Sequence, residues 1–311
     1  MLVFSCAGLF GASMRAGVGR VDITPSGPIW LTGYAARTHP SEGAIGRLWA
    51  KALAIESAPG QRIVIVTTDV VGVPGSVTRE VAARVEQQFG VKRSLFFINA
   101  SHTHTGPMIW SNLNNLTVLP AGEQQKLETY TRKFTNDLVM AIGAAIRDLS
   151  PAEVEYGTGA AGFAVNRRQA TPTGVKIGVN PNGPIDHTVP VLRITDGHGK
   201  LRAVLFGYAC HNTTLTAEVY QLTGDYAGFA AAELEKAHPG ATALFLQLCG
   251  ADQNPNPRGT IELGQKYGAE LAAEVDRVIA GSMTAVGGPI RTAFRTTELR
   301  LRRDPGAVGH V

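Results

Sequence analysis

The stretch RSLFFINASHTHTGP (residues 93–107) decides the fold that this chain is predicted to adopt. Its first part, 93–100, is mostly apolar, as in a strand that is covered on both faces. The polar segment SHTH (101–104) follows directly, and Gly106 and Pro107 then turn the chain. Ligands of open α/β sheets bind just beyond the carboxyl ends of the strands. The stretch therefore predicts a strand that ends in a polar site.

Other apolar runs along the chain end in the same way. Polar residues follow three of them: 62–68 is followed by Asp69, 201–209 by His211 and Asn212, and 241–249 by GADQN (250–254). Because the carboxyl ends of neighbouring parallel strands meet at one edge of a sheet, we expect these polar side chains to lie close together.

The rest of the chain alternates between strand and helix patterns. Further strands are predicted at 152–157, 189–195 and 291–301, and helical periodicity appears at 76–89, 123–149, 225–237 and 260–281. This alternation predicts an α/β fold built in layers. With 311 residues, 44% of them hydrophobic, and no internal repeat or low-complexity linker, the chain is expected to form one domain.

Charge gives little support for nucleic acid as a partner. The net charge of +4 comes from 29 basic and 25 acidic residues, and most of the excess lies in 290–311. Aromatic residues do not alternate with these arginines, apart from Phe294, so a solvated strand and tail is the favoured interpretation. No uncharged apolar run approaches the ~18 residues that a membrane span requires.

The first thirteen residues, MLVFSCAGLFGAS, are apolar and end in small residues. They resemble the later part of a signal peptide without its cationic region, or they precede a true start at Met14. The first alternative would place the protein in the periplasm or outside the cell. The sequence leaves the compartment and the oligomeric state open.

Three histidines supply the candidate metal ligands. His102 and His104 project the same way if the backbone between them is extended, and His211 follows another strand. Three neutral imidazoles suit zinc, although one of the pair could instead orient substrate. Cys210 could be a nucleophile, a ligand or, as the favoured alternative, a small buried hydrophobe.

Two adjacent arginines, Arg167 and Arg168, stand in NRRQ (166–169). A guanidinium group could polarise a carbonyl or bind an anion, and surface salt bridging is the alternative.

The match GTGAAG (157–162) to a dinucleotide fingerprint is rejected, because no helical pattern follows it. Motifs of nucleotide hydrolysis, serine hydrolases and zincins are absent from the sequence.

Six motifs occur in order: GRVDITPSGPIWLTGYA (19–35), NASHTHTGP (99–107), NRR (166–168), ACHNTTL (209–215), GDYAG (224–228) and CGADQNPNPRG (249–259). Together they resemble the catalytic domain of neutral/alkaline ceramidases, which are zinc amidases that cleave the N-acyl bond of ceramide. The resemblance extends from about Gly17 to the end of the chain. It implies a layered α/β domain of two mixed β-sheets flanked by helices, with a metal site at the carboxyl ends of the strands.

The resemblance also implies roles for individual residues. His102 and His211 would bind Zn²⁺, while His104 and Arg167 would line the substrate site. Asp252 is a further candidate, for proton handling or for holding a ligand. The implied partner is a lipid or acyl-amide substrate, with peripheral contact to a membrane for access to it.

Two departures from the family pattern bear on the chemistry. The family segment Gly-Asp-Val-Ser-Pro-Asn appears here as ADQNPN (251–256), so Asn254 stands where the family has its proposed nucleophile. An amide cannot attack a carbonyl, although Asn254 could donate a hydrogen bond to an oxyanion. The family completes its zinc shell with a later Glu and Tyr, which have no counterparts before Val311.

We therefore expect residues 1–13 to be a signal-peptide remnant or the result of a misassigned start, and 14–311 to be a ceramidase-like catalytic domain that is incomplete at its C-terminus. The leading hypothesis is a zinc-dependent amidase in which metal-activated water attacks the amide of ceramide or a related acyl-amide. The alternatives are a metal-dependent hydrolase of another amide or ester, and a non-catalytic binding domain or fragment that lacks a full zinc shell.

Overall fold

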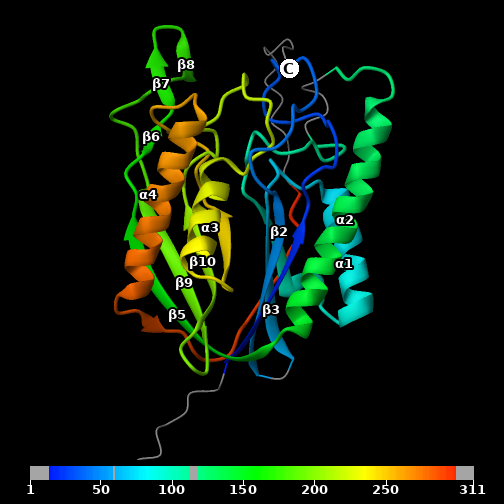
Figure 1. Ribbon diagram of the computed structural model, residues 1–311, viewed down its shortest axis with the longest axis vertical. Coiled ribbons are helices and arrows are strands. Elements are labelled where there is room, and N and C mark those ends of the chain that lie inside the picture. Colours follow the sequence, from blue (N-terminus) through cyan, green and yellow to red (C-terminus); the bar gives the residue numbers. More distant parts are fainter. Residues whose placement is uncertain (1–13, 59, 113–117, 299–311) are drawn as a thin grey trace, which may run out of the picture.

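The computed structural model describes residues 14–58, 60–112 and 118–298, and a nine-stranded β-sheet organises the fold (Figure 1). Its strands are β1 (Met14–Asp22), β2 (Trp49–Ala58), β3 (Gln61–Thr68), β4 (Phe96–Ala100), β5 (Ser150–Ala160), β9 (Thr188–Asp196), β10 (Leu201–Tyr208), β11 (Thr242–Gln247) and β13 (Thr284–Ala285). Their order is β11-β10-β9-β5-β1-β2-β3-β4, and β13 pairs with β5.

The sheet folds over on itself, so that two halves face each other. In the described part of the chain, three residue pairs, from Met14–Ala152 to Ala16–Ser150, join β1 to β5 at the fold. Apolar side chains of both halves fill the space between them, including Leu53, Ile65, Leu205 and Leu244. The two sheets that the family resemblance implies are therefore the two halves of one hydrogen-bonded sheet, and the α/β class is confirmed.

Two pairs of helices cover the outer faces of the halves. Helices α1 (Gly75–Phe89) and α2 (Glu123–Arg147) pack on the β1–β4 half, while α3 (Asp225–Ala237) and α4 (Ile261–Ala280) pack on the other (Figure 1). Each pair buries its own apolar core against the sheet. The result is a layered domain with helices on both outer faces.

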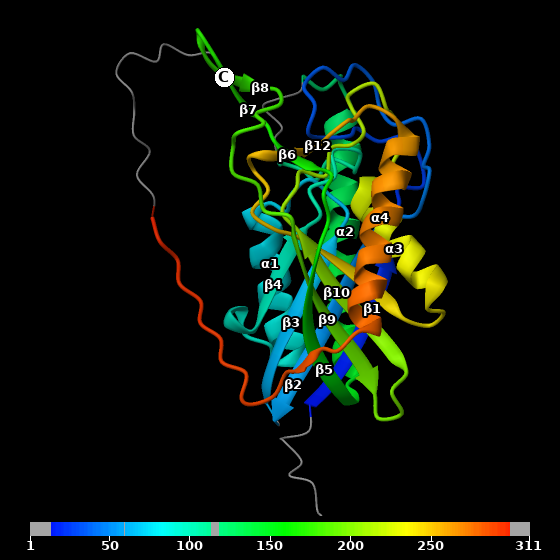
Figure 2. The ribbon, with the colours of Figure 1, turned by 90° about the vertical axis from the view of Figure 1, so that its left-hand side faces the viewer.

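The strands that precede the polar segments run in the same direction. β4 is parallel to β3, and β11 is parallel to β10. Their carboxyl ends carry loops that lie at the top of the molecule in Figure 1. Two short pairs belong to the same end: β6 (Ala164–Asn166) with β12 (Gln253–Pro255), and β7 (Arg168–Thr171) with β8 (Gly174–Ile177), which projects outward (Figure 2).

Most predicted elements are confirmed, with small shifts at their ends. All four helices are present, and of the run 93–100 only Phe96–Ala100 is strand, because Arg93–Leu95 form a 3₁₀ turn. The strand predicted at 291–301 is wrong for 291–298, which hold no strand, and its last residues lie outside the described part of the chain. Within this segment, the Phe294 ring packs against the Arg93 guanidinium, which lies 4.4 Å from the ring centre.

Residues 1–13, on which the two N-terminal alternatives depend, also lie outside the described residues. Within the described ranges, no helix has both the length and the apolar character needed to cross a membrane.

A side-chain clasp closes the open edge of the folded sheet. The Asn99 side chain, at the end of β4, donates to the Gln247 carbonyl oxygen (3.1 Å) and accepts from the Gln247 backbone N–H (2.9 Å). It thus pairs with the edge of β11 as another strand would. Both strands lead directly into the loops that carry the candidate site, so the clasp fixes these loops relative to one another.

We expect Asn99→Leu to lower the free energy of unfolding by about 1–3 kcal/mol, because two backbone groups of Gln247 lose their partners. Urea denaturation measures the effect. The control is Asn136→Leu, since Asn136 lies exposed on α2 and its side chain accepts a hydrogen bond from Arg84. That change should stay within about 0.5 kcal/mol, and equal effects of the two variants would contradict the assigned role of the clasp.

Candidate metal centre

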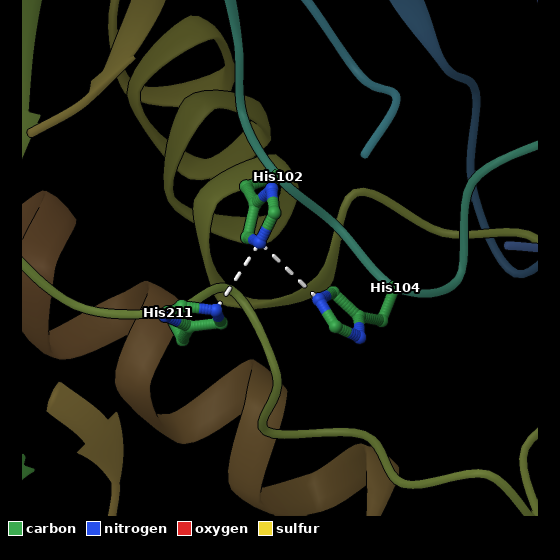
Figure 3. Close-up of side chains that lie close together, drawn as sticks. All are labelled: His102, His104 and His211. Carbon is green, nitrogen blue, oxygen red and sulfur yellow. Dashed lines mark hydrogen bonds between the residues drawn. The ribbon is translucent and has the colours of Figure 1, made fainter. Parts of the chain in front are cut away.

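Three imidazole rings meet at the carboxyl ends of β4 and β10, as Figure 3 shows. The Nε2 atom of His102 lies 3.2 Å from Nε2 of His211 and 3.4 Å from Nε2 of His104. One nitrogen from each ring falls within 4.8 Å of the others. The structure thus brings together three side chains that are distant in sequence, in the arrangement expected of ligands around one ion.

Backbone carbonyls determine which nitrogen of two of these rings is available. His102 Nδ1 lies 2.6 Å from the Val71 carbonyl oxygen, and His211 Nδ1 lies 2.8 Å from that of Gly250. A carbonyl only accepts hydrogen bonds, so each Nδ1 carries the proton and each neutral ring presents an unprotonated Nε2. Such carbonyl partners commonly orient metal-binding histidines.

The two Nε2 lone pairs of His102 and His211 therefore face each other across 3.2 Å with no proton between them. Two acceptors at this distance repel one another, and a cation placed between them would remove the repulsion. His102 also has a backbone φ of 62°, an unusual value for a residue with a side chain. Such conformations cluster at functional sites, where the surrounding structure maintains them.

His104 differs from the other two rings. Its Nδ1 is buried and has no hydrogen-bond partner within the described part of the chain. No carbonyl therefore fixes the proton on Nδ1, and His104 can carry its proton on Nε2 as a donor. His104 therefore differs from His102 and His211, whose Nε2 atoms are left unprotonated by the carbonyl contacts at Nδ1.

Burial keeps all three rings in the neutral form that binds metals. It lowers the pKa of His104 to about 2 and that of His211 to about 4, and it also lowers the pKa of His102. The positive charge of Arg167 contributes to the lowered pKa of each ring. A neutral imidazole at pH 7 needs no deprotonation before it coordinates an ion.

Arg167 lies beside this cluster and is tied to the segment that follows β11. Its Nε donates to the Ala251 carbonyl oxygen (3.1 Å) and its Nη1 to Oδ1 of Asn254 (3.2 Å), which also accepts from Thr213 Oγ1 (3.3 Å). A guanidinium group has only donors, so the oxygen of the Asn254 amide must face it. The Asn254 amide nitrogen is left to donate elsewhere.

Asp252 takes a different position. Its Oδ2 accepts from Asn166 Nδ2 (3.3 Å), and its backbone oxygen accepts from the Arg167 N–H (2.7 Å). None of its hydrogen bonds among the described residues reaches a histidine. The contacts therefore support a role for Asp252 in holding the Arg167 segment.

Cys210 precedes His211 but packs into the core beneath α3 and α4. Burial raises the pKa of its thiol well above the usual value, which disfavours the reactive thiolate. The interpretation of Cys210 as a small buried hydrophobe is confirmed.

The GTGAAG segment (157–162) begins in β5 and leads to β6 rather than to a helix, which agrees with its rejection as a dinucleotide fingerprint.

The fold and these motifs define an N-terminal ceramidase domain. Residues 14–286 match the family model described as "Neutral/alkaline non-lysosomal ceramidase, N-terminal", and the chain belongs to this family.

Individual relatives agree with this assignment. The neutral ceramidase of Pseudomonas aeruginosa is 30% identical over 256 residues, and the match covers 78% of this chain and 37% of that protein. The neutral ceramidase of Mycobacterium tuberculosis is 26% identical over 279 residues, and the match covers 80% of this chain and 41% of that protein. The chain thus spans roughly two fifths of the length of these curated relatives.

Solved structures share the fold. The crystal structure of neutral ceramidase from Pseudomonas aeruginosa superimposes with a TM-score of 0.75 at 24% identity, covering 89% of this chain and 46% of that one. A structure titled "Ceramidase complexed with C2" gives a TM-score of 0.74 at 23% identity, covering 89% of this chain and 45% of that one.

Proposed function

We propose that this chain carries the zinc-binding part of a hydrolase that cleaves the N-acyl amide bond of ceramide or a related acyl-amide. One observation carries the proposal: the unprotonated Nε2 atoms of His102 and His211 face each other at 3.2 Å, and a backbone carbonyl holds each ring in that state. Nitrogen donors of this kind suit Zn²⁺. Membership of the ceramidase family supplies the substrate class.

The residues around the histidines suit the cleavage of an amide. Bound zinc would supply a water of lowered pKa as the nucleophile, a part that the Asn254 amide cannot play. His104, through Nε2–H, and the remaining donors of Arg167 would bind the oxyanion that develops on the substrate carbonyl. The Asn254 amide oxygen accepts a hydrogen bond from Arg167, which positions the amide nitrogen as a further donor.

Metal analysis of the purified chain tests the proposal. We expect about one zinc ion per chain, with activity lost on chelation and restored by Zn²⁺, because the Nε2 atoms of His102 and His211 are held unprotonated toward one position. Two imidazoles fill half of the usual tetrahedral shell, so other ligands or water would complete it. Fatty-acid release from ceramide is then compared with release from a panel of acyl-amides and esters. Cleavage of other substrates but not ceramide would favour another metal-dependent hydrolase. Absence of stoichiometric zinc would favour a binding domain or fragment.

A further inference from the structure

A loop near the N-terminus wraps around His104. It spans 31–37 and includes the end of the GRVDITPSGPIWLTGYA motif (19–35), to which the sequence assigns no function. Two backbone contacts hold this loop against the histidine segment. Leu31 forms an isolated bridge with Pro107, and the Thr32 N–H donates to the Gly106 carbonyl oxygen (3.4 Å).

The His104 ring lies directly on the backbone of Gly33. A Cβ atom at Gly33 would come within 2.5 Å of Cγ and Nδ1 of His104, closer than real Cβ atoms approach other atoms. The φ of Gly33 is +103°, a conformation that residues with side chains rarely adopt. Glycine is therefore required here both by the backbone conformation and by the ring that occupies the space.

Tyr34 packs against another part of the same ring. The centroids of the Tyr34 and His104 rings are 4.8 Å apart in an edge-to-face arrangement. The Tyr34 hydroxyl donates to the Leu215 carbonyl oxygen (2.8 Å) and accepts from Arg258 Nη2 (3.0 Å). Arg258 belongs to the CGADQNPNPRG motif (249–259), so Tyr34 links the loop to the segment that contacts Arg167.

Arg37 binds the backbone of His104 through a hydrogen bond to its carbonyl oxygen. Its side chain is buried (4% exposed) and donates to the carbonyl oxygens of His104 (2.6 Å), Thr32 (3.3 Å) and Val219 (3.0 Å). Among the described residues it forms no ion pair with a carboxylate. A buried charge without an acidic partner is costly for stability, which suggests that Arg37 is kept for the site.

These contacts replace what the carbonyls of Val71 and Gly250 do for the other two rings. His104 has no hydrogen bond at Nδ1, and its Nε2 makes one long contact, to His102 Nε2 (3.4 Å), so packing largely sets the orientation of its imidazole. We propose that Gly33, Tyr34 and Arg37 are positioning residues that hold His104 with Nε2 directed at the reaction site, where it can donate to the substrate. This inference rests on the proposed function, and it predicts an effect on the chemical step without an effect on metal binding.

A pair of glycine variants separates ring displacement from backbone strain. Gly33→Ala and Gly43→Ala both place a methyl group on a backbone with nearly the same φ, +103° and +107°, but a Cβ at Gly43 meets nothing within 4 Å. We expect Gly33→Ala to lower kcat about 100-fold, as a displacement of about 1 Å in a catalytic group can do. Zinc content should remain that of the parent chain, and Gly43→Ala should retain kcat within about threefold.

Nitrogen-15 spectra of the histidine rings provide a readout that does not depend on activity. In Gly33→Ala the His104 signals should shift or broaden while those of His102 and His211 stay unchanged. Unchanged His104 signals would overturn the positioning role whether or not ceramide is cleaved. Shifted His104 signals in a protein whose parent chain cleaves no substrate would instead count against the proposed function alone.

If Gly33→Ala fails to fold, two variants of Tyr34 test the same idea. Tyr34→Phe keeps the ring against His104, whereas Tyr34→Leu removes it. The His104 signals and kcat should be largely retained in Tyr34→Phe and lost in Tyr34→Leu. Equal behaviour of the two variants in both measurements would contradict positioning by the ring.

Discussion

Replacement of either His102 or His211 by alanine is expected to weaken zinc binding by more than about 100-fold, since loss of a mere hydrogen-bond partner of a ligand already costs about 10–100-fold. Amide hydrolysis should fall with the metal. Each variant removes one of the two nitrogens that face each other at 3.2 Å, and the remaining imidazole cannot hold the ion alone. Metal content after dialysis and a competition titration with a chromophoric chelator measure the loss.

His198→Ala is the matched control for these variants. His198 lies exposed in the turn between β9 and β10 and should leave both metal content and activity unchanged. His104→Ala completes the series, because a donor that faces substrate can be removed without loss of zinc, while a third ligand cannot. Unchanged zinc content and unchanged hydrolysis in both His102→Ala and His211→Ala would refute the proposed site.

The strands that carry the site could be predicted because their sequences are short buried runs bounded by polar residues. β1 could not be predicted in this way. Its sequence, MRAGVGRVD, is interrupted by Gly17 and Gly19 and lacks a clear alternation. The structure explains the glycines: a Cβ on either would lie 2.2 Å from a carbonyl oxygen of α2, so both are needed for the strand to approach the helix.

β2 was missed for a different reason. Lys51 and Glu56 lie in the strand and are buried, although charged residues are usually exposed. Lys51 is stabilised by Glu235 of α3 (2.6 Å) and by the Ala243 carbonyl oxygen (2.8 Å), both distant in sequence. A pattern that reads only neighbouring residues cannot anticipate a partner that the tertiary fold supplies.

In the candidate site, too, some residues could be predicted from the sequence and others could not. The three histidines could be found from residue type, because imidazole is a common metal ligand. The carbonyls of Val71 and Gly250 that fix two of the rings could not, since any residue provides a backbone oxygen. Gly33 and Arg37, which hold His104, could not be found in this way, because Gly33 has no side chain and the LTGYAAR segment (31–37) does not follow a predicted strand.

The folded sheet accounts for the position of the site. His102 and His104 come from the loop after β4, in one half of the sheet, whereas His211 follows β10 in the other. An ion bound by His102 and His211 would therefore link the two halves at their upper edge. The Asn99 clasp lies next to the site, at the ends of β4 and β11. The spacing of the histidines therefore depends on contacts of the chain that do not involve a metal.

Arg167→Met is expected to lower kcat/KM by ~10²–10³-fold, the usual effect of removing one donor to an oxyanion. Zinc content should not change, because Arg167 contacts neither ligand ring by a hydrogen bond in the described structure. In Arg167, Nε–H donates to the Ala251 carbonyl oxygen and one Nη1–H donates to the Asn254 side-chain oxygen. The remaining N–H groups of the guanidinium are left to donate to substrate. Hydrolysis rates and metal content of the same preparation test both parts.

The neighbouring arginine provides the control, and Asn254 provides the decisive comparison. Arg168 is exposed and its side chain donates a hydrogen bond to the Ala251 carbonyl oxygen (3.3 Å), so Arg168→Met should retain most of the activity.

If Asn254 acts by orienting Arg167, Asn254→Ala should slow the reaction in the parent chain but add little in an Arg167→Met background, because groups that act as a unit are not additive. Fully additive losses would mean that Asn254 contacts the oxyanion independently. Equal losses in Arg167→Met and Arg168→Met would show that the region needs only positive charge, and that the hydrogen-bonded geometry of Arg167 has no part in the reaction.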